Sequence, residues 1–356
     1  MTLLTVSDFE KHAKEKLTQA AYDYYSSGAN EEITLRENCD AYKRIFLKYR
    51  VLSDVSKRQL STEVLGQKIS MPLMIAPTAF HKMANEFGEV AVAKAATKAG
   101  TIMILSTLSN SSVEEVTAAS EGNIWFQLYV FKDREVTINL IKRVENAGCK
   151  ALVLTVDAPL LGLRERDVRN KFTLPEGFTV KNLEPYYKEK LSVKTDSGIA
   201  GYFSENLDPS LNWKDIEWLK SNTNLPIVIK GIGCKEDALL AVQYGADAIV
   251  VSNHGGRQLD TCRATIDVLP EVADAVSGKI EILLDGGIRR GTDILKALAF
   301  GAKAVLTGRP VLWGLAADGE NGVSSVLDIL RNEFDLAMTL CGCDSVNKIS
   351  KDLIAD

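Results

Sequence analysis

The chain has 356 residues, of which 46% are hydrophobic and 25% charged, and its formal net charge is −5. This composition is ordinary for a globular protein with an ample core. A mildly acidic balance without Lys/Arg-rich blocks argues against nucleic acid as a partner. No apolar run reaches the ~18 residues that a membrane helix needs. We therefore expect neither a nucleic-acid partner nor a membrane segment.

The residues at the two termini and the cysteines indicate in which cellular compartment the protein resides. The first residues lack a basic region followed by an apolar run, so no signal peptide is predicted, and the last three are not a peroxisomal signal. The six cysteines are scattered, and the one close pair, Cys341 and Cys343, lacks the repeated spacing of a zinc site. We expect a reduced, cytoplasmic compartment and no metal site.

Helical patterns occupy residues 7 to about 46, where Ser7 is the predicted N-cap and Glu10 follows three residues later. Beyond them, short apolar runs alternate with longer amphipathic ones. The predicted strands are 73–76, 101–105, 124–129, 151–156, 227–230, 248–251, 280–284 and 302–306. The predicted helices are 88–99, 112–119, 134–147, 235–243, 292–299 and 326–338.

The junctions between helices and strands repeat one pattern, in which a helix ends at a glycine and a strand follows. Four glycines occupy such junctions: Gly100, Gly148, Gly245 and Gly301. Eight strands with intervening helices predict a single α/β domain, residues 1–356, folded as a (β/α)8 TIM barrel. Its N-terminal helical segment would be 1–65 and its barrel about 66–356. A doubly wound sheet is the alternative, but its first strand should precede a glycine-rich turn, and Pro77-Thr78-Ala79 is not one.

A long segment, residues 159–225, interrupts this rhythm between the fourth and fifth predicted strands. It contains Gly, Pro, Lys, Ser and three tyrosines, and it is too polar for a membrane anchor. Loops of this length are usually lids or mobile segments. We expect a lid around residues 176–210.

Polar side chains follow the predicted strands at their C-terminal ends, the edge where barrel enzymes carry their active sites. In chain order they are Thr78, Ser106, Gln127 with Tyr129, Thr155 with Asp157, Lys230, Ser252 with His254 and Arg257, Asp285 with Arg289, and Arg309. So many polar groups imply one large polar ligand at the barrel mouth.

The last two loops, 284–291 and 307–310, indicate a phosphate site. Their glycines let the backbone approach an anion, whose charge Arg289 and Arg309 would neutralise. A plain tight turn at Asp285-Gly286-Gly287 is the alternative for the first loop taken alone.

The segment Ser252–Asp260, of sequence SNHGGRQLD, carries the clearest chemistry. His254 can take a proton near neutral pH, and Arg257 can clamp a carboxylate with two hydrogen bonds. Lys230 could form a Schiff base, pair with a carboxylate, lie beside an anionic ring or simply reach solvent. Asp157 could cap a helix or orient an imidazolium.

Taken together, these residues resemble the FMN-dependent 2-hydroxy-acid oxidase and dehydrogenase family over about residues 3–350. The segment 252–260 is the family's signature. Segments 22–25, 74–79, 126–129 and 284–293 also look like family segments. Within the family, the chain resembles the branch of glycolate and lactate oxidases.

The resemblance implies FMN as the cofactor. The residues that would hold the flavin ring and ribityl chain are Thr78, Ala79, Ser106, Gln127, Thr155, Lys230 and Ser252. Those that would hold the ribityl chain and phosphate are Asp285, Gly287, Arg289, Gly308 and Arg309. Lys230 would face the N1/O2 edge of the ring.

The same resemblance implies how a substrate would be held. Arg257, Arg164 and the Tyr24 hydroxyl would bind its carboxylate, and Tyr129 would bind its hydroxyl. His254 would be the base, and Asp157 would stabilise the protonated imidazole. The implied reaction oxidises a small L-2-hydroxy acid to the 2-oxo acid and reduces dioxygen to hydrogen peroxide. Family members form homotetramers, sometimes octamers, and we expect the same here.

Leu108 bears on which acid is oxidised, because plant glycolate oxidases carry a tryptophan at its position. Leucine leaves room for a methyl group, a contact of about 1–3 kcal/mol. We therefore expect L-lactate, with glycolate or a broader, longer-chain range of L-2-hydroxy acids as the alternative. An aldolase that uses Lys230, or a flavin-dependent isomerase, is the alternative of a different class, but neither explains His254 and Arg257.

Overall fold

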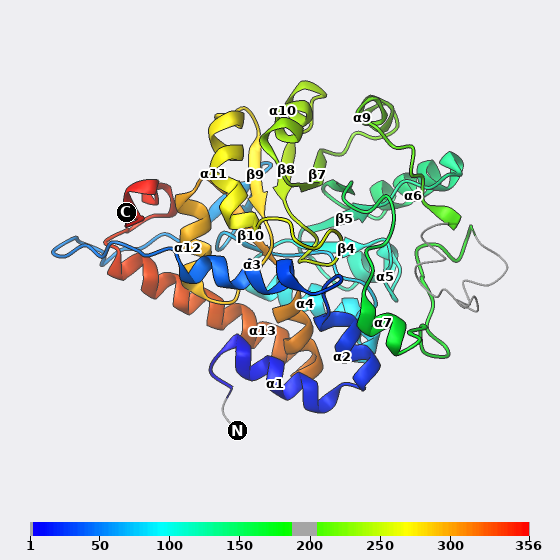
Figure 1. Cartoon of the computed structure of the whole chain (residues 1–356), viewed down its shortest axis with the longest axis horizontal. Helices are drawn as coiled ribbons and strands as arrows, with labels where there is room; N and C mark the ends of the chain where they lie inside the picture. The colour runs from blue at the N-terminus through cyan, green and yellow to red at the C-terminus, as the bar shows by residue number, and fades with distance from the viewer. Residues whose placement is uncertain (1–2, 187–204, 356) are drawn as a thin grey trace.

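The computed structural model describes residues 3–186 and 205–355. Over these ranges, eight parallel strands close into a barrel that helices surround (Figure 1). Around the barrel the strands are β10 (Ala304–Thr307), β3 (Leu73–Ile75), β4 (Met103–Ser106), β5 (Ile124–Leu128), β6 (Leu152–Thr155), β7 (Ile227–Ile232), β8 (Ala248–Val251) and β9 (Glu281–Leu284). Val305 pairs with Leu73, which joins the last strand to the first. The predicted (β/α)8 barrel is confirmed, and the closed sheet excludes the doubly wound alternative.

Helices connect these strands as the sequence predicted, with some additions. Three helices precede the barrel: α1 (Val6–Lys16), α2 (Gln19–Ser26) and α3 (Ile33–Lys43). The helices around it are α4 (Gly88–Ala99), α5 (Val113–Ala118), α6 (Arg134–Asn146), α10 (Lys235–Gln243), α11 (Thr265–Val276), α12 (Gly291–Ala299) and α13 (Arg309–Leu340). α11 was not predicted. α13 begins well before the predicted residue 326 and is broken by a kink at Asp318 and Gly319, whose backbone is not helical.

The predicted insertion runs between β6 and β7. Its described parts contain two short helices, α7 (Glu165–Arg169) and α9 (Lys214–Lys220), and Leu207 pairs with Phe131 after β5. Of the lid expected around 176–210, residues 187–204 lie outside the described residues.

The first helix begins earlier than predicted. Thr5, not Ser7, is the N-cap of α1, and its hydroxyl accepts a hydrogen bond from the Asp8 N–H. The Asp8 carboxylate in turn accepts from the Thr5 N–H at 3.1 Å. This capping box satisfies the free N–H groups of the first turn, so the Ser7–Glu10 pair lies inside the helix.

The predicted glycine junctions are confirmed. Gly100 is the C-cap of α4 with a φ of +65°, a conformation that favours glycine. The other three junction glycines also have positive φ: Gly148, Gly245 and Gly301.

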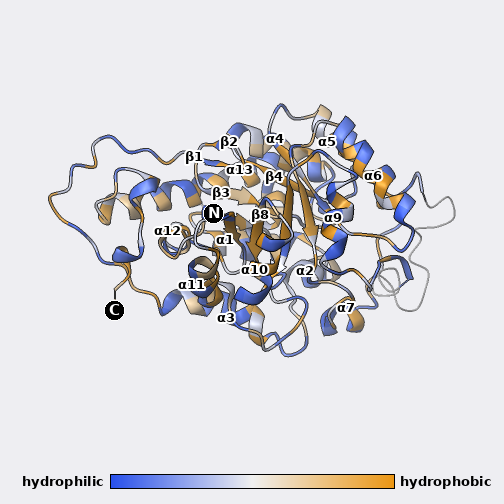
Figure 2. Ribbon diagram, turned by 90° about the horizontal axis from the view of Figure 1, so that it is seen from above, coloured by the Kyte–Doolittle hydropathy of each residue, from blue (hydrophilic) through white to orange (hydrophobic). Residues whose placement is uncertain are grey.

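An antiparallel hairpin, β1 (Thr62–Val64) and β2 (Gln67–Ile69), closes the N-terminal end of the barrel. Val64 and Ile69 are buried against interior side chains that include Trp125, whose indole N–H donates to Gln67 Oε1 at 3.0 Å. Figure 2 shows the hydrophobic strands at the centre of the molecule. Because packed side chains fill this end, a ligand has to enter from the opposite one.

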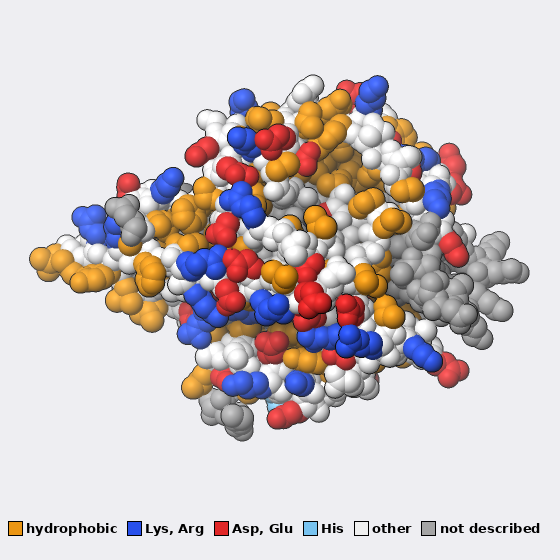
Figure 3. Space-filling model, viewed as in Figure 1, with side chains coloured by type: hydrophobic (Ala, Val, Ile, Leu, Met, Phe, Trp, Pro, Cys, Tyr) orange, Lys and Arg blue, Asp and Glu red, His pale blue; other side chains and the backbone are white. Residues whose placement is uncertain are grey.

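The molecular surface mixes charges of both signs across the face shown in Figure 3. One end projects as a loop, residues 46–52, whose large apolar side chains are exposed: Phe46, Tyr49, Val51 and Leu52. An apolar patch of this kind is typical of an interaction surface. Among the described helices, none combines the length and the apolar character needed to cross a membrane.

Candidate active site

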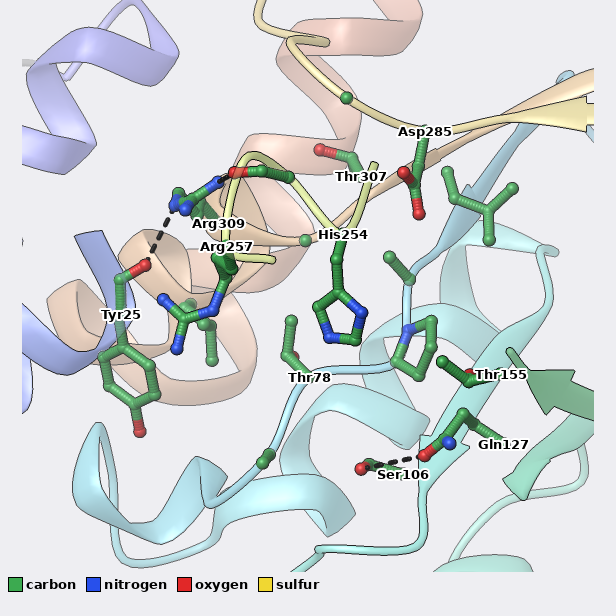
Figure 4. A pocket seen from close by; sticks show the side chains of 18 of the residues that line it. Tyr25, Thr78, Ser106, Gln127, Thr155, His254, Arg257, Asp285, Thr307 and Arg309 are labelled. Carbon is green, nitrogen blue, oxygen red and sulfur yellow. Dashed lines mark hydrogen bonds between the residues drawn. The ribbon is translucent and has the colours of Figure 1, made fainter. Parts of the chain in front are cut away.

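A cavity opens where the C-terminal ends of the strands meet, and its non-atom space is about 1050 Å³ with the open mouth included. The predicted site residues that line it are Tyr24, Thr78, Ala79, Ser106, Leu108, Gln127, Tyr129, Thr155, Arg164, Lys230, His254, Arg257, Asp285, Gly287, Arg289, Gly308 and Arg309. Asp157 and Ser252 do not line it but contact His254 and Lys230, which do. In Figure 4 the imidazole of His254 lies between Arg257 on one side and Thr155 with Gln127 on the other.

His254 and Asp157 form a hydrogen-bonded pair although 97 residues separate them. The imidazole Nδ1 lies 2.8 Å from Asp157 Oδ1, and the His254 backbone N–H donates to Ser252 Oγ at 3.1 Å. Gly231 permits this approach, because a Cβ there would lie 2.6 Å from the Cβ of Asp157. Of the two sequence hypotheses for Asp157, the contact favours orientation of the imidazole over helix capping. With Nδ1 engaged, Nε2 is the nitrogen left to exchange a proton.

Burial and neighbouring charges shift the pKa values of His254 and Asp157 and so determine the protonation state of each. Burial lowers the pKa of His254, an effect that Asp157 only partly offsets. Burial alone would raise the pKa of Asp157, but His254 and Lys230 bring it below its usual value. The resting pair is therefore a neutral imidazole beside a carboxylate, which is the state that a general base requires.

Two arginines reach the cavity from different loops. Arg164 is buried, and burial together with the neighbouring Arg257 lowers its pKa to about 10. Arg257 donates to the carbonyl oxygens of Tyr24 and Ser27 at 2.7 and 2.9 Å. Its guanidinium lies over the Tyr24 ring, 5.1 Å from the centroid. Because two cations lie close together out of water, this side of the cavity favours an anion.

Tyr24 and Tyr129 complete this side of the site. Burial raises the pKa of both phenols, so both hydroxyls stay protonated and able to donate. The Tyr24 ring also stacks on Phe172 at a centroid separation of 4.6 Å, which fixes its orientation.

Lys230 carries a fixed positive charge on the floor of the cavity. Its ammonium lies 2.9 Å from Asp285 Oδ2 and donates to Ser252 Oγ at 2.9 Å. Burial opposes the charge, but Asp285 and Asp157 raise the pKa of Lys230 above its usual value. A Schiff-base lysine needs a neutral amine, so the geometry favours the carboxylate-pairing hypothesis. Lys230 does not end its strand as predicted, since β7 continues to Ile232 with a register shift between the two.

Neutral polar groups at the other strand ends have a defined orientation. Gln127 Oε1 accepts from the Thr107 N–H and the Ser106 hydroxyl, which turns the amide nitrogen toward the cavity. At the strand ends that line the cavity, four buried polar atoms have no hydrogen-bond partner among the described residues: Gln127 Nε2, Thr155 Oγ1, Asp285 Oδ1 and Thr307 Oγ1. Each unsatisfied atom costs about 1–3 kcal/mol, and a polar ligand would satisfy them.

The two predicted phosphate loops are also cationic. Burial, with Arg257 and Arg289 nearby, lowers the pKa of Arg309 to about 9. Its guanidinium donates to three backbone carbonyls, those of Tyr25, Ser27 and Gly255. Gly308 precedes α13, whose N-terminus adds partial positive charge.

Two backbone amides of the first loop are engaged elsewhere. The backbone N–H groups of Arg289 and Arg290 donate to the Asp293 carboxylate, which caps α12, rather than toward the cavity. The loops therefore attract an anion through guanidinium charge more than through these amides.

The cavity also includes side chains that the sequence analysis did not select: Tyr25, Leu161, Thr307 and Leu312. Thr307 is the last residue of β10, and the prediction missed it because the strand was ended one residue early. Tyr25 comes from α2 and donates its hydroxyl to the Phe80 carbonyl at 2.6 Å. Reading strand ends alone could not find a residue on a preceding helix.

Fold and site together define a (β/α)8-barrel enzyme whose cavity holds a His–Asp pair, two neighbouring arginines and a polar floor. The chain belongs to the FMN-dependent dehydrogenase family, whose sequence model matches residues 13–356. FMN is accordingly its cofactor, and the unsatisfied atoms of the floor and the cationic loops fit that group.

Individual relatives agree over nearly the whole chain. Glycolate oxidase 3 of Arabidopsis thaliana is 55% identical over 99% of this chain and 95% of its own length. Glycolate oxidase of Spinacia oleracea is 52% identical over 100% and 96% of the two chains, and 2-hydroxyacid oxidase of Dictyostelium discoideum is 51% identical over 100% and 91%. Among solved structures, mandelate oxidase with (S)-4-hydroxymandelic acid has a TM-score of 0.94 and 41% identity, covering 99% of this chain and 98% of that one.

Proposed function

We propose that the protein oxidises a small 2-hydroxy acid to the 2-oxo acid, R–CHOH–COO⁻ + O2 → R–CO–COO⁻ + H2O2. The observation that carries this proposal is the neutral His254–Asp157 pair in one cavity with Arg164 and Arg257. A base beside an anion clamp suits an alcohol whose neighbouring carbon bears a carboxylate.

FMN, when bound, would take up the two electrons that leave the alcohol carbon. The protein's part is to hold and deprotonate the acid. Arg164 and Arg257 would bind the carboxylate, the protonated hydroxyls of Tyr24 and Tyr129 would donate to it and to the alcohol oxygen, and His254 Nε2 would accept a proton. Asp157 would then stabilise the imidazolium that forms.

Glycolate is the substrate that we propose first, because several relatives of about half identity are named glycolate oxidases. These relatives support glycolate, the alternative in the sequence analysis, better than L-lactate, the substrate that the sequence analysis favours. L-lactate remains the second candidate on one observation: Leu108 is buried and lines the cavity, where a smaller side chain than tryptophan leaves room for a methyl group.

We expect anaerobic glycolate to bleach the flavin absorbance of the holoenzyme, and L-lactate to do so with a lower kcat/KM. Stopped-flow absorbance with each acid measures this directly. A higher kcat/KM for L-lactate would reverse the choice of substrate. Unchanged absorbance with both acids would reject both as substrates and leave the longer-chain 2-hydroxy acids to be tested in the same way.

Leu108→Trp tests whether the size of side chain 108 decides which acid fits the cavity. The larger ring should lower kcat/KM for L-lactate relative to glycolate by ~10-fold or more. Equal losses for both acids would show that residue 108 does not contact the substrate side chain.

The acid limb of the pH profile should lie below the ordinary imidazole pKa of 6.5, because burial lowers the pKa of His254. A base acts only when it is unprotonated, so kcat/KM should persist as the pH falls through 6.5 and decline at lower pH. Asp157 raises the pKa of His254, so Asp157→Asn should move the limb lower still. A limb at or above 6.5 in the wild type would contradict a buried neutral base.

The acceptor, the compartment and the assembly are proposals as well. Dioxygen as electron acceptor is tested by comparing the yield of peroxide with the reduction of an artificial dye.

We propose a cytoplasmic location and a homotetramer or octamer, for which the exposed apolar loop 46–52 offers a contact surface. Light scattering of the purified protein measures the assembly.

A further inference from the structure

A largely buried carboxylate, that of Asp167, lies beside Arg164, one of the two arginines that would bind the substrate. Its side chain is 16% exposed, and its Oδ2 is 4.0 Å from Nη1 of Arg164, whose side chain is 5% exposed. Burial raises the pKa of Asp167, and the positive charges of Arg257, Arg164 and Arg166 oppose this rise, in that order of effect. Asp167 therefore forms a long ion pair with Arg164, and the positive charge of Arg257 acts on it as well.

Helix capping does not explain this residue. Asp167 is the third residue of α7, where a carboxylate commonly reaches back to the N-cap N–H. α7 has no side-chain capping bond, and Asp167 Oδ1 has no hydrogen-bond partner among the described residues. The side chain is turned to the arginines instead, at the expense of a buried, unsatisfied oxygen.

Arg166, the residue before Asp167, is paired with other carboxylates. Arg166 lies 2.6 Å from Glu32 and 3.7 Å from Asp23, and Asn170 donates to Asp23 at 2.8 Å. The two contacts to Asp23 attach α7 to α2, beside which it lies (Figure 1). Asp167 itself is held in place through its carbonyl, which accepts from the N–H of Phe172, the residue stacked on Tyr24.

The clamp thus consists of two guanidinium groups and one carboxylate, with a net charge of +1. We propose that Asp167 is a positioning residue that acts through Arg164 and Arg257 and sets this charge, so that the clamp matches an acid with one carboxylate rather than two. Interaction energy is proportional to the ligand's charge. Removing the carboxylate should therefore favour a dianion more than a monoanion.

This inference rests on the proposed function and is tested by binding of two anions that cannot be oxidised as 2-hydroxy acids. Oxalate is the dianionic probe and acetate the monoanionic one, each titrated against the holoenzyme while the flavin absorbance is followed. In Asp167→Asn, the ratio of the acetate to the oxalate dissociation constant should rise about 10-fold. The conservative Asp167→Glu should keep the wild-type ratio.

Glu32→Gln is the matched control, since it removes one negative charge that pairs with Arg166 of α7 rather than with the clamp arginines. Its ratio should equal that of the wild type. If Asp167→Asn folds poorly, Asp167→Ser supplies a second neutral variant. An unchanged ratio in a neutral variant, with both anions weakened equally, would reduce Asp167 to a structural residue and overturn the inference. Failure of the proposed function would be seen separately, as a wild-type flavin that no 2-hydroxy acid bleaches.

Discussion

Replacing His254 with alanine is expected to slow flavin reduction by the substrate by about 10²–10⁴-fold, the usual contribution of a general base. The variant should still bind FMN, because the floor formed by Gln127, Thr155 and Lys230 is unaltered. Anaerobic stopped-flow absorbance gives the reduction rate, and the flavin spectrum after gel filtration gives the cofactor content.

His12→Ala is the control for this variant, because His12 lies on α1 and pairs only weakly with Glu15, 3.7 Å away. Its reduction rate should equal that of the wild type. Rapid reduction in His254→Ala would remove the base assignment. Loss of FMN from that variant would instead show that the imidazole supports the cofactor site.

The barrel could be predicted because each strand is buried on both faces. Such strands are continuous apolar runs, as in Ala248–Val251, and they alternate with helices that end at glycine. The β1–β2 hairpin escaped prediction because its three-residue strands carry Glu63 and Lys68. Only Val64 and Ile69 reach the barrel core, a tertiary contact that no local pattern shows.

The missed helix α11 has a local cause. It contains Pro270 in its interior, and proline usually marks a helix boundary. Its tertiary environment overrides this preference, since Ile266, Leu269 and Val272 are buried in the main core. The displaced N-cap of α1 is a smaller error of the same kind, in which two overlapping capping patterns compete.

For the site, the sequence predicted which residues gather but not how they pair. Strand order places Asp157 and His254 at one end of the barrel, yet only the structure shows their 2.8 Å contact. The Lys230–Asp285 pair likewise joins two strands that are not neighbours in the sequence. Asp167 could not be predicted as a site residue, because it lies inside the insertion and does not follow a predicted strand.

Replacing Lys230 with methionine should have the largest effect on stability. It would leave Asp285 buried without its cation, and breaking a buried pair from one side typically costs about 3–5 kcal/mol. FMN affinity should also fall, because the positive charge of the cavity floor is lost. Urea unfolding of the apoprotein measures the first effect, and fluorescence titration with FMN the second.

The double variant Lys230→Met/Asp285→Asn separates the two effects. Without a buried lone carboxylate, the apoprotein should recover most of its free energy of unfolding, since replacing both partners of a buried pair is often neutral. FMN affinity should stay low, because no cation has been restored. Recovery of both properties would mean that Lys230 serves only to neutralise Asp285. If Lys230→Met lowered neither the free energy of unfolding nor the FMN affinity, the buried pair would not stabilise the protein. The assignment of Lys230 to the cofactor site would then be wrong as well.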